Sequence, residues 1–105
     1  MNNSPFGLLP HASFSILFAL SLKPRHGYEL LQQITADSDG AATIGAGALY
    51  GTLKKLAAES FVEDMPFEGD PRRRYYRLTV KGWARLRTDV AYYTRITALA
   101  KQRQV

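Results

Sequence analysis

The sequence predicts a mainly α-helical domain with a small β-hairpin, and three observations lead to that fold class. The chain has 105 residues, of which 46% are hydrophobic, and this suits one domain with a real core. Four segments carry apolar residues at the three-four spacing of a helix that buries one face. Between the third and fourth segments, two β-prone stretches flank the turn sequence EGDP, as in a hairpin.

The first third of the chain is expected to contain a leader and two helices. Residues 1–12 carry Asn, Ser, Pro and Gly and are predicted to form a flexible leader. An apolar helix is predicted over Ser13–Leu22, and the sequence KPRHG ends it because Pro24 cannot continue a helix. A second helix is predicted from Gly27 to about Asp37, since its leucines and its isoleucine share one face.

The third helix is predicted over Ala46–Ser60, after a polar linker. Leu53 and Leu56 fall within about 40° of Leu49 on a helical projection, so these leucines are expected to face the core. The opposite side is small and basic and carries no acid. It consists of Gly47, Gly51, Lys54, Lys55 and Ala58.

A hairpin and a long helix complete the chain. Phe61–Phe67 is predicted to form an edge strand because Pro66 lies near its end. The sequence RRRYYRL, Arg72–Leu78, is predicted to return as the second strand. Thr79 is a suitable N-cap for a last helix from Val80 to about Gln102.

Three helices followed by a basic hairpin is the element order of a winged helix-turn-helix. The second and third helices would form the helix-turn-helix, the third being the recognition helix, and the hairpin would be the wing. We therefore divide the chain into a flexible leader (1–12), a winged helix-turn-helix DNA-binding domain (13–79) and a C-terminal dimerisation helix (80–105), all within one compact unit.

Charge is distributed unevenly along the chain. The net charge is +5, yet residues 1–70 carry a net of −4 and residues 71–105 a net of +9. A basic segment of this kind favours a nucleic acid or an anionic surface as partner, and a merely solvated basic face is the alternative. The chain has no cysteine, which excludes disulfides and thiolate sites and suits a reducing cytoplasm.

The arginine run of the wing predicts contacts with DNA phosphates. Strand alternation places Arg72 and Arg74 on one face with Tyr76, and Arg73 on the other. One of the two tyrosines should pack into the core, and we expect Tyr76 to point outward with the arginines. The candidate DNA-binding residues are Thr43, Ala46, Ala48, Tyr50, Lys54, Lys55, Arg72, Arg73, Arg74 and Tyr76.

Four sequence stretches, in order and at suitable separations, resemble the PadR family of bacterial transcriptional regulators. They are HGYEL (His26–Leu30), GALYGTLKKL (Gly47–Leu56), SFVED (Ser60–Asp64) and RRRYYRLTVKG (Arg72–Gly82). The resemblance covers the chain from about Ile16 onward. Because a single helix follows the wing, the chain is similar to the short-tailed branch of the family. The family usually has glycine at the position of Ser60, serine or threonine at that of Ala48, and often proline at that of Gly51. The last two positions lie on or near the face of the recognition helix, so the family's preference for particular bases does not carry over to this chain.

The resemblance implies a homodimer that binds a pseudo-palindromic operator and represses transcription. Two recognition helices would enter successive major grooves about 34 Å apart. Apolar residues at three-four spacing along the last helix independently favour helix pairing, and packing on the subunit's own first helix is the alternative. The expected residues of the dimer interface or effector pocket are Ile16, Leu20, Trp83, Leu86, Val90, Tyr93, Ile96 and Leu99.

The resemblance also implies a small aromatic or drug-like effector, for which Trp83, Tyr92 and Tyr93 could line a pocket at the interface. An ordinary interface core is the plainer interpretation of these aromatic residues. His26 is expected to cap the second helix, and Tyr28 to pack beneath the recognition helix.

Other functions fit the sequence less well. The two histidines show no triad or ligand spacing, so no enzyme, metal or cofactor is expected. A winged-helix adaptor that binds protein remains the main alternative, although Lys54 and Lys55 on the recognition helix argue against it. Membrane binding by the last helix would need an apolar face that dimerisation would bury.

Overall fold

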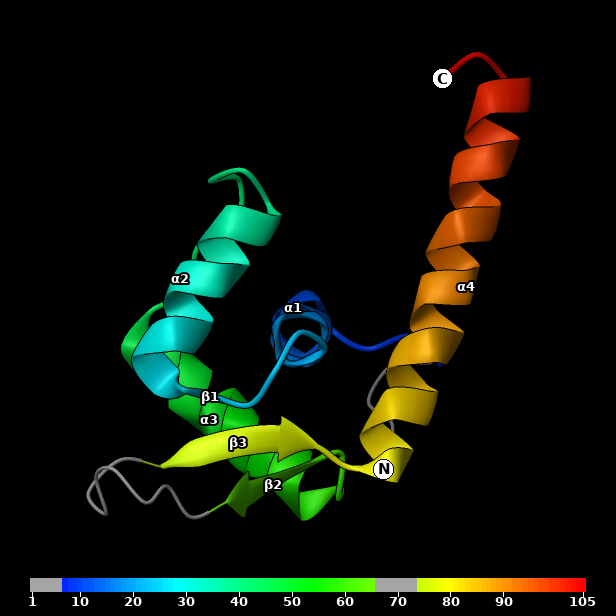
Figure 1. Cartoon of the computed structure of the whole chain (residues 1–105). Coiled ribbons are helices and arrows are strands. Elements are labelled where there is room, and N and C mark those ends of the chain that lie inside the picture. The colour runs from blue at the N-terminus through cyan, green and yellow to red at the C-terminus, as the bar shows by residue number, and fades with distance from the viewer. Residues whose placement is uncertain (1–6, 66–73) are drawn as a thin grey trace.

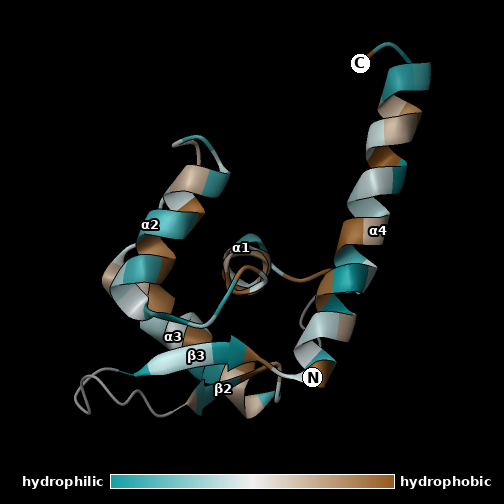
Figure 2. Ribbon diagram, in the orientation of Figure 1, coloured by the Kyte–Doolittle hydropathy of each residue, from teal (hydrophilic) through white to brown (hydrophobic). Residues whose placement is uncertain are grey.

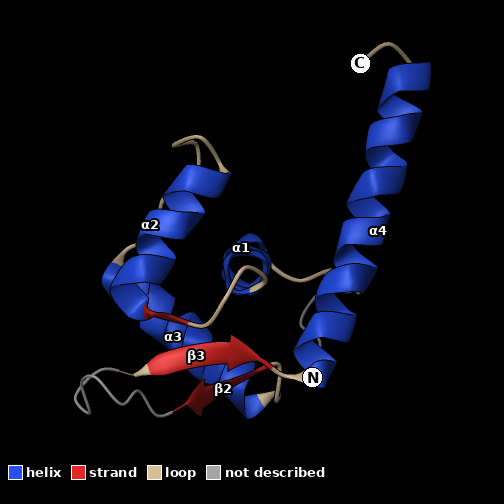
Figure 3. Ribbon diagram, viewed as in Figure 1, coloured by secondary structure: helices blue, strands red, loops and turns tan. Residues whose placement is uncertain are grey.

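The computed structural model describes residues 7–65 and 74–105 and shows a mainly helical fold with a small antiparallel sheet, as the sequence predicts (Figure 3). The elements are α1 (His11–Leu20), β1 (Arg25–His26), α2 (Gly27–Asp37), α3 (Ala46–Ala58), β2 (Val62–Met65), β3 (Tyr75–Leu78) and α4 (Val80–Gln102). Within the described ranges, no helix is long and apolar enough to cross a membrane.

Helix α1 lies at the centre of the fold, with α2 on one side and α4 on the other (Figure 1). It contacts α2, α3, α4 and β3. Ile16 and Leu17 are fully buried, and seven of the ten residues of the helix are hydrophobic. Figure 2 shows this helix end-on, with brown hydrophobic parts among paler and teal ones. A helix that is hydrophobic on most sides needs neighbours on most sides, which explains why α1 is at the centre.

The segment before α1 differs from the flexible leader that the sequence predicts. Helix α1 begins at His11, two residues before the predicted start, with Pro10 at the N-cap position. Leu9 is buried and belongs to the hydrophobic core. The expectation of a free leader is therefore wrong for residues 7–12, whereas residues 1–6 lie outside the described part of the chain.

The sheet contains one strand more than the predicted hairpin. Strand β3 lies in the middle, with β2 on one side and β1 on the other, and both pairings are antiparallel. Helix α1 ends at Leu20, two residues before the predicted end and before the KPRHG sequence, and Arg25 and His26 then run extended and pair with Tyr76 and Tyr75 of β3. The pairing of β1 with β3 therefore connects the start of α2 directly to the wing.

Helix α3 ends at a left-handed residue, Ser60, whose φ is +64°. The Ser60 N–H donates to the carbonyl of Ala57 at 3.0 Å, and the Phe61 N–H donates to the carbonyl of Leu56 at 2.9 Å. These two bonds form a Schellman motif, in which the left-handed position favours glycine. Phe61 and Leu56 are both buried, so the motif also directs the chain into the core.

Helix α4 begins where the sequence predicts and is fastened to the end of α3. Thr79 caps it by accepting a hydrogen bond of 2.9 Å from the Gly82 N–H, and its hydroxyl donates to the carbonyl of Ser60 at 2.5 Å. A Cβ at Gly82 would lie 2.0 Å from the carbonyl oxygen of Phe61, so only glycine allows this approach. The helix then extends well beyond the core, and the molecule reaches 51 Å in its longest dimension.

Ser60→Gly should stabilise the protein. Serine in the left-handed region costs roughly 1 kcal/mol relative to glycine, so the variant should raise the free energy of unfolding by about that amount and the Tm by several degrees. Thermal unfolding followed by circular dichroism measures the change.

Ala58→Gly is the matched control for this prediction. It places glycine two residues earlier, in the helical last turn of α3, where glycine should lower the stability. A Ser60→Gly variant that is no more stable than the parent would contradict the proposed strain at Ser60.

Candidate nucleic-acid interface

The outward side of α3 is nearly bare of side chains. Leu49, Leu53 and Leu56 are buried against the core, as the sequence predicts. A Cβ placed on Gly47 or Gly51 would meet no heavy atom within 4 Å, so this side of the helix faces open space. The exposed residues in and just before the helix include Thr43, Ala46, Ala48, Tyr50, Lys54 and Lys55, all of which the sequence predicts to be candidates.

Tyr50 lies across the first turn of α2. A Cβ on Gly27 would lie 2.2 Å from the Tyr50 hydroxyl oxygen, so the ring occupies the space that glycine leaves free. An open groove of about 670 Å³ runs beside this contact, between the start of α2, Tyr50 and Arg74. The groove therefore connects the helix-turn-helix with the base of the wing.

His26 and Glu29 form a capping box at the start of α2. The His26 Nδ1 accepts the Glu29 N–H at 3.4 Å, and the Glu29 carboxylate accepts the His26 N–H at 3.2 Å. The predicted capping role of His26 is thus confirmed. Tyr28 does not pack beneath α3 as expected, because it is 65% exposed and lines the groove. Its helical spacing from Leu30 and Ile34 already places it on the other side of α2.

The described part of the wing carries two cross-strand ion pairs. Arg74 pairs with Asp64, and the Arg77 Nε donates to the Glu63 carboxylate at 2.7 Å. All four side chains are largely exposed, so the pairs lie at the surface. Arg72 and Arg73, the other predicted phosphate contacts, lie outside the described residues.

Tyr76 is a predicted DNA-binding residue that the structure places in the core. Only 7% of it is exposed, so the expectation that it points outward with the arginines is wrong. The reason is strand alternation: Leu78 is buried two residues later, on the same face of β3. Burial, followed by the nearby Asp64 carboxylate, raises the pKa of the Tyr76 phenol above its usual value. Tyr75 is the partly exposed tyrosine of the pair, with its ring 5.2 Å from that of His26.

The residues predicted to form the dimer interface or effector pocket divide into two groups. Ile16, Leu20 and Leu86 are buried within the subunit. These three residues therefore pack in the subunit's own core, which was the alternative to a place in the dimer interface. Trp83 is partly buried against the same core, with the Arg87 guanidinium 5.4 Å from its ring. The remaining four lie farther along α4 and keep accessible surface: Val90, Tyr93, Ile96 and Leu99.

An aromatic cluster on α1 and α4 accompanies this accessible surface. The Phe14 ring lies 5.2 Å from that of Tyr93, edge to face, and 5.8 Å from that of Phe18, which it stacks against. Tyr92 contacts Tyr93 at 5.3 Å. Phe14 and Phe18 are not among the predicted site residues, although their four-residue spacing places them on one face of an apolar helix.

Comparisons with known proteins identify relatives. The Transcriptional regulator PadR-like family matches residues 16–88. A protein of Lysinibacillus sphaericus, described as uncharacterized protein X, is 31% identical over 80 residues, which are 72% of each chain.

Solved structures with the same fold include a PadR family regulator and a regulator with a known small-molecule response. A PadR family transcription regulator from Clostridium difficile has a TM-score of 0.76 at 21% identity, over 91% of this chain and all of that one. Bordetella bronchiseptica BpsR, whose DNA binding is regulated by 6-hydroxynicotinic acid, has a TM-score of 0.71 at 21% identity, over 90% of this chain and 67% of that one.

The family match spans more than half of the chain and includes α2, α3, the described strands and the first part of α4. It therefore covers the whole candidate interface. The chain belongs to the PadR-like family of DNA-binding transcriptional regulators.

Proposed function

We propose that this protein is a homodimeric repressor that binds a pseudo-palindromic duplex site and blocks transcription sterically. The observation that carries the proposal is the bare, basic outer side of α3. It has open space over Gly47 and Gly51, and Lys54 is exposed close by. A helix with so little side-chain bulk can lie deep in a major groove.

The composition of this side favours certain kinds of contact. Glycine and alanine offer no hydrogen-bonding groups to bases, but alanine methyls can contact the methyl group of thymine. Lys54 and Lys55 supply positive charge that attracts phosphates. Lys55 lines a small cavity beside Pro10, on another flank of α3, so Lys54 is the better placed of the two for the groove.

The wing and α2 would hold the DNA backbone beside this groove. Arg74 borders the same opening as Tyr50, Tyr28 and Gln32, so a cation, two phenols and an amide line it, together with the capping pair His26 and Glu29. Such groups commonly donate hydrogen bonds to phosphate oxygens, which position a protein on DNA without specifying sequence. Arg72 and Arg73 would extend this contact along the wing.

A second copy of the chain would cover the aromatic cluster and the accessible side of α4. Val90, Tyr92, Tyr93 and Ile96 are each between 37% and 43% exposed, and Phe18 is 42% exposed. Together they form an apolar surface larger than single scattered residues would give. A two-fold axis through this surface would pair identical patches, and it would point the two α3 helices at neighbouring half-sites.

The same cluster suggests how the repressor would be released. An aromatic or drug-like compound would bind among Phe14, Tyr92 and Tyr93 between the two copies and alter their relative position. BpsR responds to an aromatic compound, 6-hydroxynicotinic acid, on a similar fold, which supports this class of effector.

Selection of bound sequences from random duplex DNA, followed by a salt titration, tests the proposed function. We expect a pseudo-palindrome whose affinity falls steeply with salt. Changing Arg72, Arg73 and Arg74 to alanine should reduce the salt slope by about one for each arginine that contacts a phosphate.

The matched control changes Arg87, Arg95 and Lys101 to alanine, which removes the same charge from the side of α4 that faces away from Ile96. This variant should bind nearly as the parent does. If selection enriches no sequence, the protein is not a specific regulator, and the adaptor function becomes the better hypothesis.

Asp64→Asn should increase DNA affinity. The Asp64 carboxylate pairs with Arg74 and would also repel phosphates, so its neutral amide frees one cation and removes one repulsion. Because an exposed pair of this kind is worth about 0.5–1 kcal/mol, the gain should be about two- to fivefold at moderate salt. Fluorescence anisotropy on the selected duplex measures it.

Asp37→Asn at the end of α2 is the control for that prediction, because it removes the same charge far from the wing. A gain of equal size there would mean that overall charge, and not the release of Arg74, raises the affinity. A loss of affinity in Asp64→Asn would contradict the arrangement outright.

Ile96→Asp should convert the dimer to a monomer, because it places a charge in the proposed apolar interface. Sedimentation equilibrium measures the mass, and the affinity for the palindrome should fall with it. Ala98→Asp, which is exposed about 160° around α4 from Ile96, should remain dimeric. A dimeric Ile96→Asp protein would place the interface elsewhere.

A further inference from the structure

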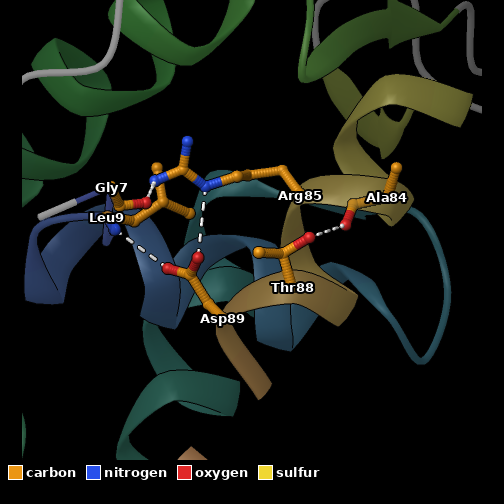
Figure 4. A network of polar contacts seen from close by, with 6 residues as sticks. All are labelled: Gly7, Leu9, Ala84, Arg85, Thr88 and Asp89. Atoms are coloured by element: carbon orange, nitrogen blue, oxygen red, sulfur yellow. Dashed lines mark hydrogen bonds and ion pairs between the residues drawn. The ribbon is translucent and has the colours of Figure 1, made fainter. Parts of the chain in front are cut away.

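Asp89, halfway along α4, is a fully buried carboxylate with no role in the functions discussed so far. Its Oδ2 accepts the Leu9 N–H at 2.9 Å, and its Oδ1 accepts a bond from the Arg85 Nε at 3.2 Å. The Arg85 guanidinium also donates to the carbonyl of Gly7. Figure 4 shows how these groups connect α4 with the segment that leads into α1.

Burying the carboxylate of Asp89 is unfavourable for the free energy of folding. Removing a charge from water is unfavourable, and an apolar residue of similar volume often packs there with equal or greater stability. A pair of hydrogen bonds has one property that apolar contact lacks, because donor and acceptor must meet at one distance and angle. Asp89 and Arg85 therefore fix where α4 lies along the Gly7–Pro10 segment, where apolar packing alone would tolerate sliding.

Helix α4 has a second attachment, two turns earlier. There the Thr79 hydroxyl binds the carbonyl of Ser60, the Lys81 Nζ binds the carbonyl of Glu59 at 2.8 Å, and Gly82 touches Phe61. All of these partners belong to the end of α3 or directly follow it. The contacts of Asp89 and Arg85 thus fix α4 to the segment before α1, and those of Thr79, Lys81 and Gly82 fix it to the end of the recognition helix.

Two attachments about 10 Å apart define the direction of the rest of the helix. The buried residues of α4 are Gly82, Leu86 and Asp89, and no residue after Asp89 is buried. The Phe14–Tyr93 ring contact lies one turn farther on, and Tyr93 is still 40% exposed. About 20 Å of helix therefore projects at an angle that the attachments at Gly82 and Asp89 dictate.

We infer that Asp89 is a positioning residue that sets the separation of the two recognition helices, and hence the half-site spacing that the dimer accepts. The inference rests on the proposed dimer through the projecting half of α4. A small tilt at Asp89 displaces the far end of that half, where the partner binds. Because the start of α4 is attached to the end of α3, the same tilt also changes the distance between the two α3 helices of the dimer.

The test uses the selected operator with its half-sites moved apart or together in steps of one base pair. Each base pair shifts one half-site by about 3.4 Å and rotates it about the helix axis, so the parent dimer should prefer one spacing by about tenfold or more. In Asp89→Leu, which keeps the size and removes the hydrogen bonds, that preference should fall to about threefold or less, or move to another spacing. Affinity for a single half-site should stay within about twofold, because the recognition helix is untouched.

Thr88→Ala is the matched control. Its hydroxyl bonds only within α4, to the carbonyl of Ala84 at 3.1 Å, so its spacing profile should equal that of the parent. Circular dichroism and sedimentation establish that each variant is folded and dimeric. If Asp89→Leu does not fold, Asp89→Asn takes its place, since it keeps the shape and removes the charge that holds Arg85.

The outcomes separate the inference from the proposed function. A parent protein that is monomeric, or that shows no spacing preference, overturns the proposed dimeric repressor. A parent with a sharp preference that the folded Asp89 variant reproduces overturns only the inference. A broadened or shifted profile with intact half-site binding supports it, because a role in stability alone would not change the spacing.

Discussion

Burial of α1 is the constraint on which the rest of this structure depends. An apolar helix of ten residues can only be buried if other elements surround it, and α2, α3, α4 and β3 do so. The core residues of those elements, such as Leu30, Leu53 and Leu86, all belong to the cluster that contains Ile16. The recognition helix, the wing and the projecting helix thus have fixed relative positions because they share this one buried partner.

The two functional parts of the molecule use charge differently. The recognition helix has few side chains of any kind on its outer side, and Lys54 has no acid three or four residues away along the helix. On the wing, Arg74 and Arg77 each have an acidic partner on β2. The positive charge of these two arginines is therefore partly neutralised within the protein itself. If the wing contacts DNA as proposed, changes on β2 can adjust the affinity without altering the residues of α3.

The sequence predicts those features that depend on local signals and fails for those that depend on tertiary context. The bounds of α2 and α4 agree with prediction because Pro24, the His26 cap and the Thr79 cap act within a few residues. Strand β1 could not be predicted, because two residues become a strand only when the edge of β3 lies beside them. Tyr76 was misplaced because alternation gives two possible faces, although the apolar Leu78 on the same face could have decided between them. Which of the predicted interface residues are buried within the subunit and which stay accessible on α4 depends on the position of α1. No local pattern in the sequence reveals that position.

The contact between Tyr50 and Gly27 has a consequence for the thermodynamics of binding. A tyrosine on an open helix surface samples several rotamers, and ordering such a side chain on association costs free energy. Here the missing side chain at Gly27 gives the ring a fixed place against α2 before any partner arrives. If Tyr50 meets the DNA backbone as proposed, its conformational entropy has already been lost in folding. The protein would then bind with a side chain that is preorganised, which slows dissociation without adding a contact.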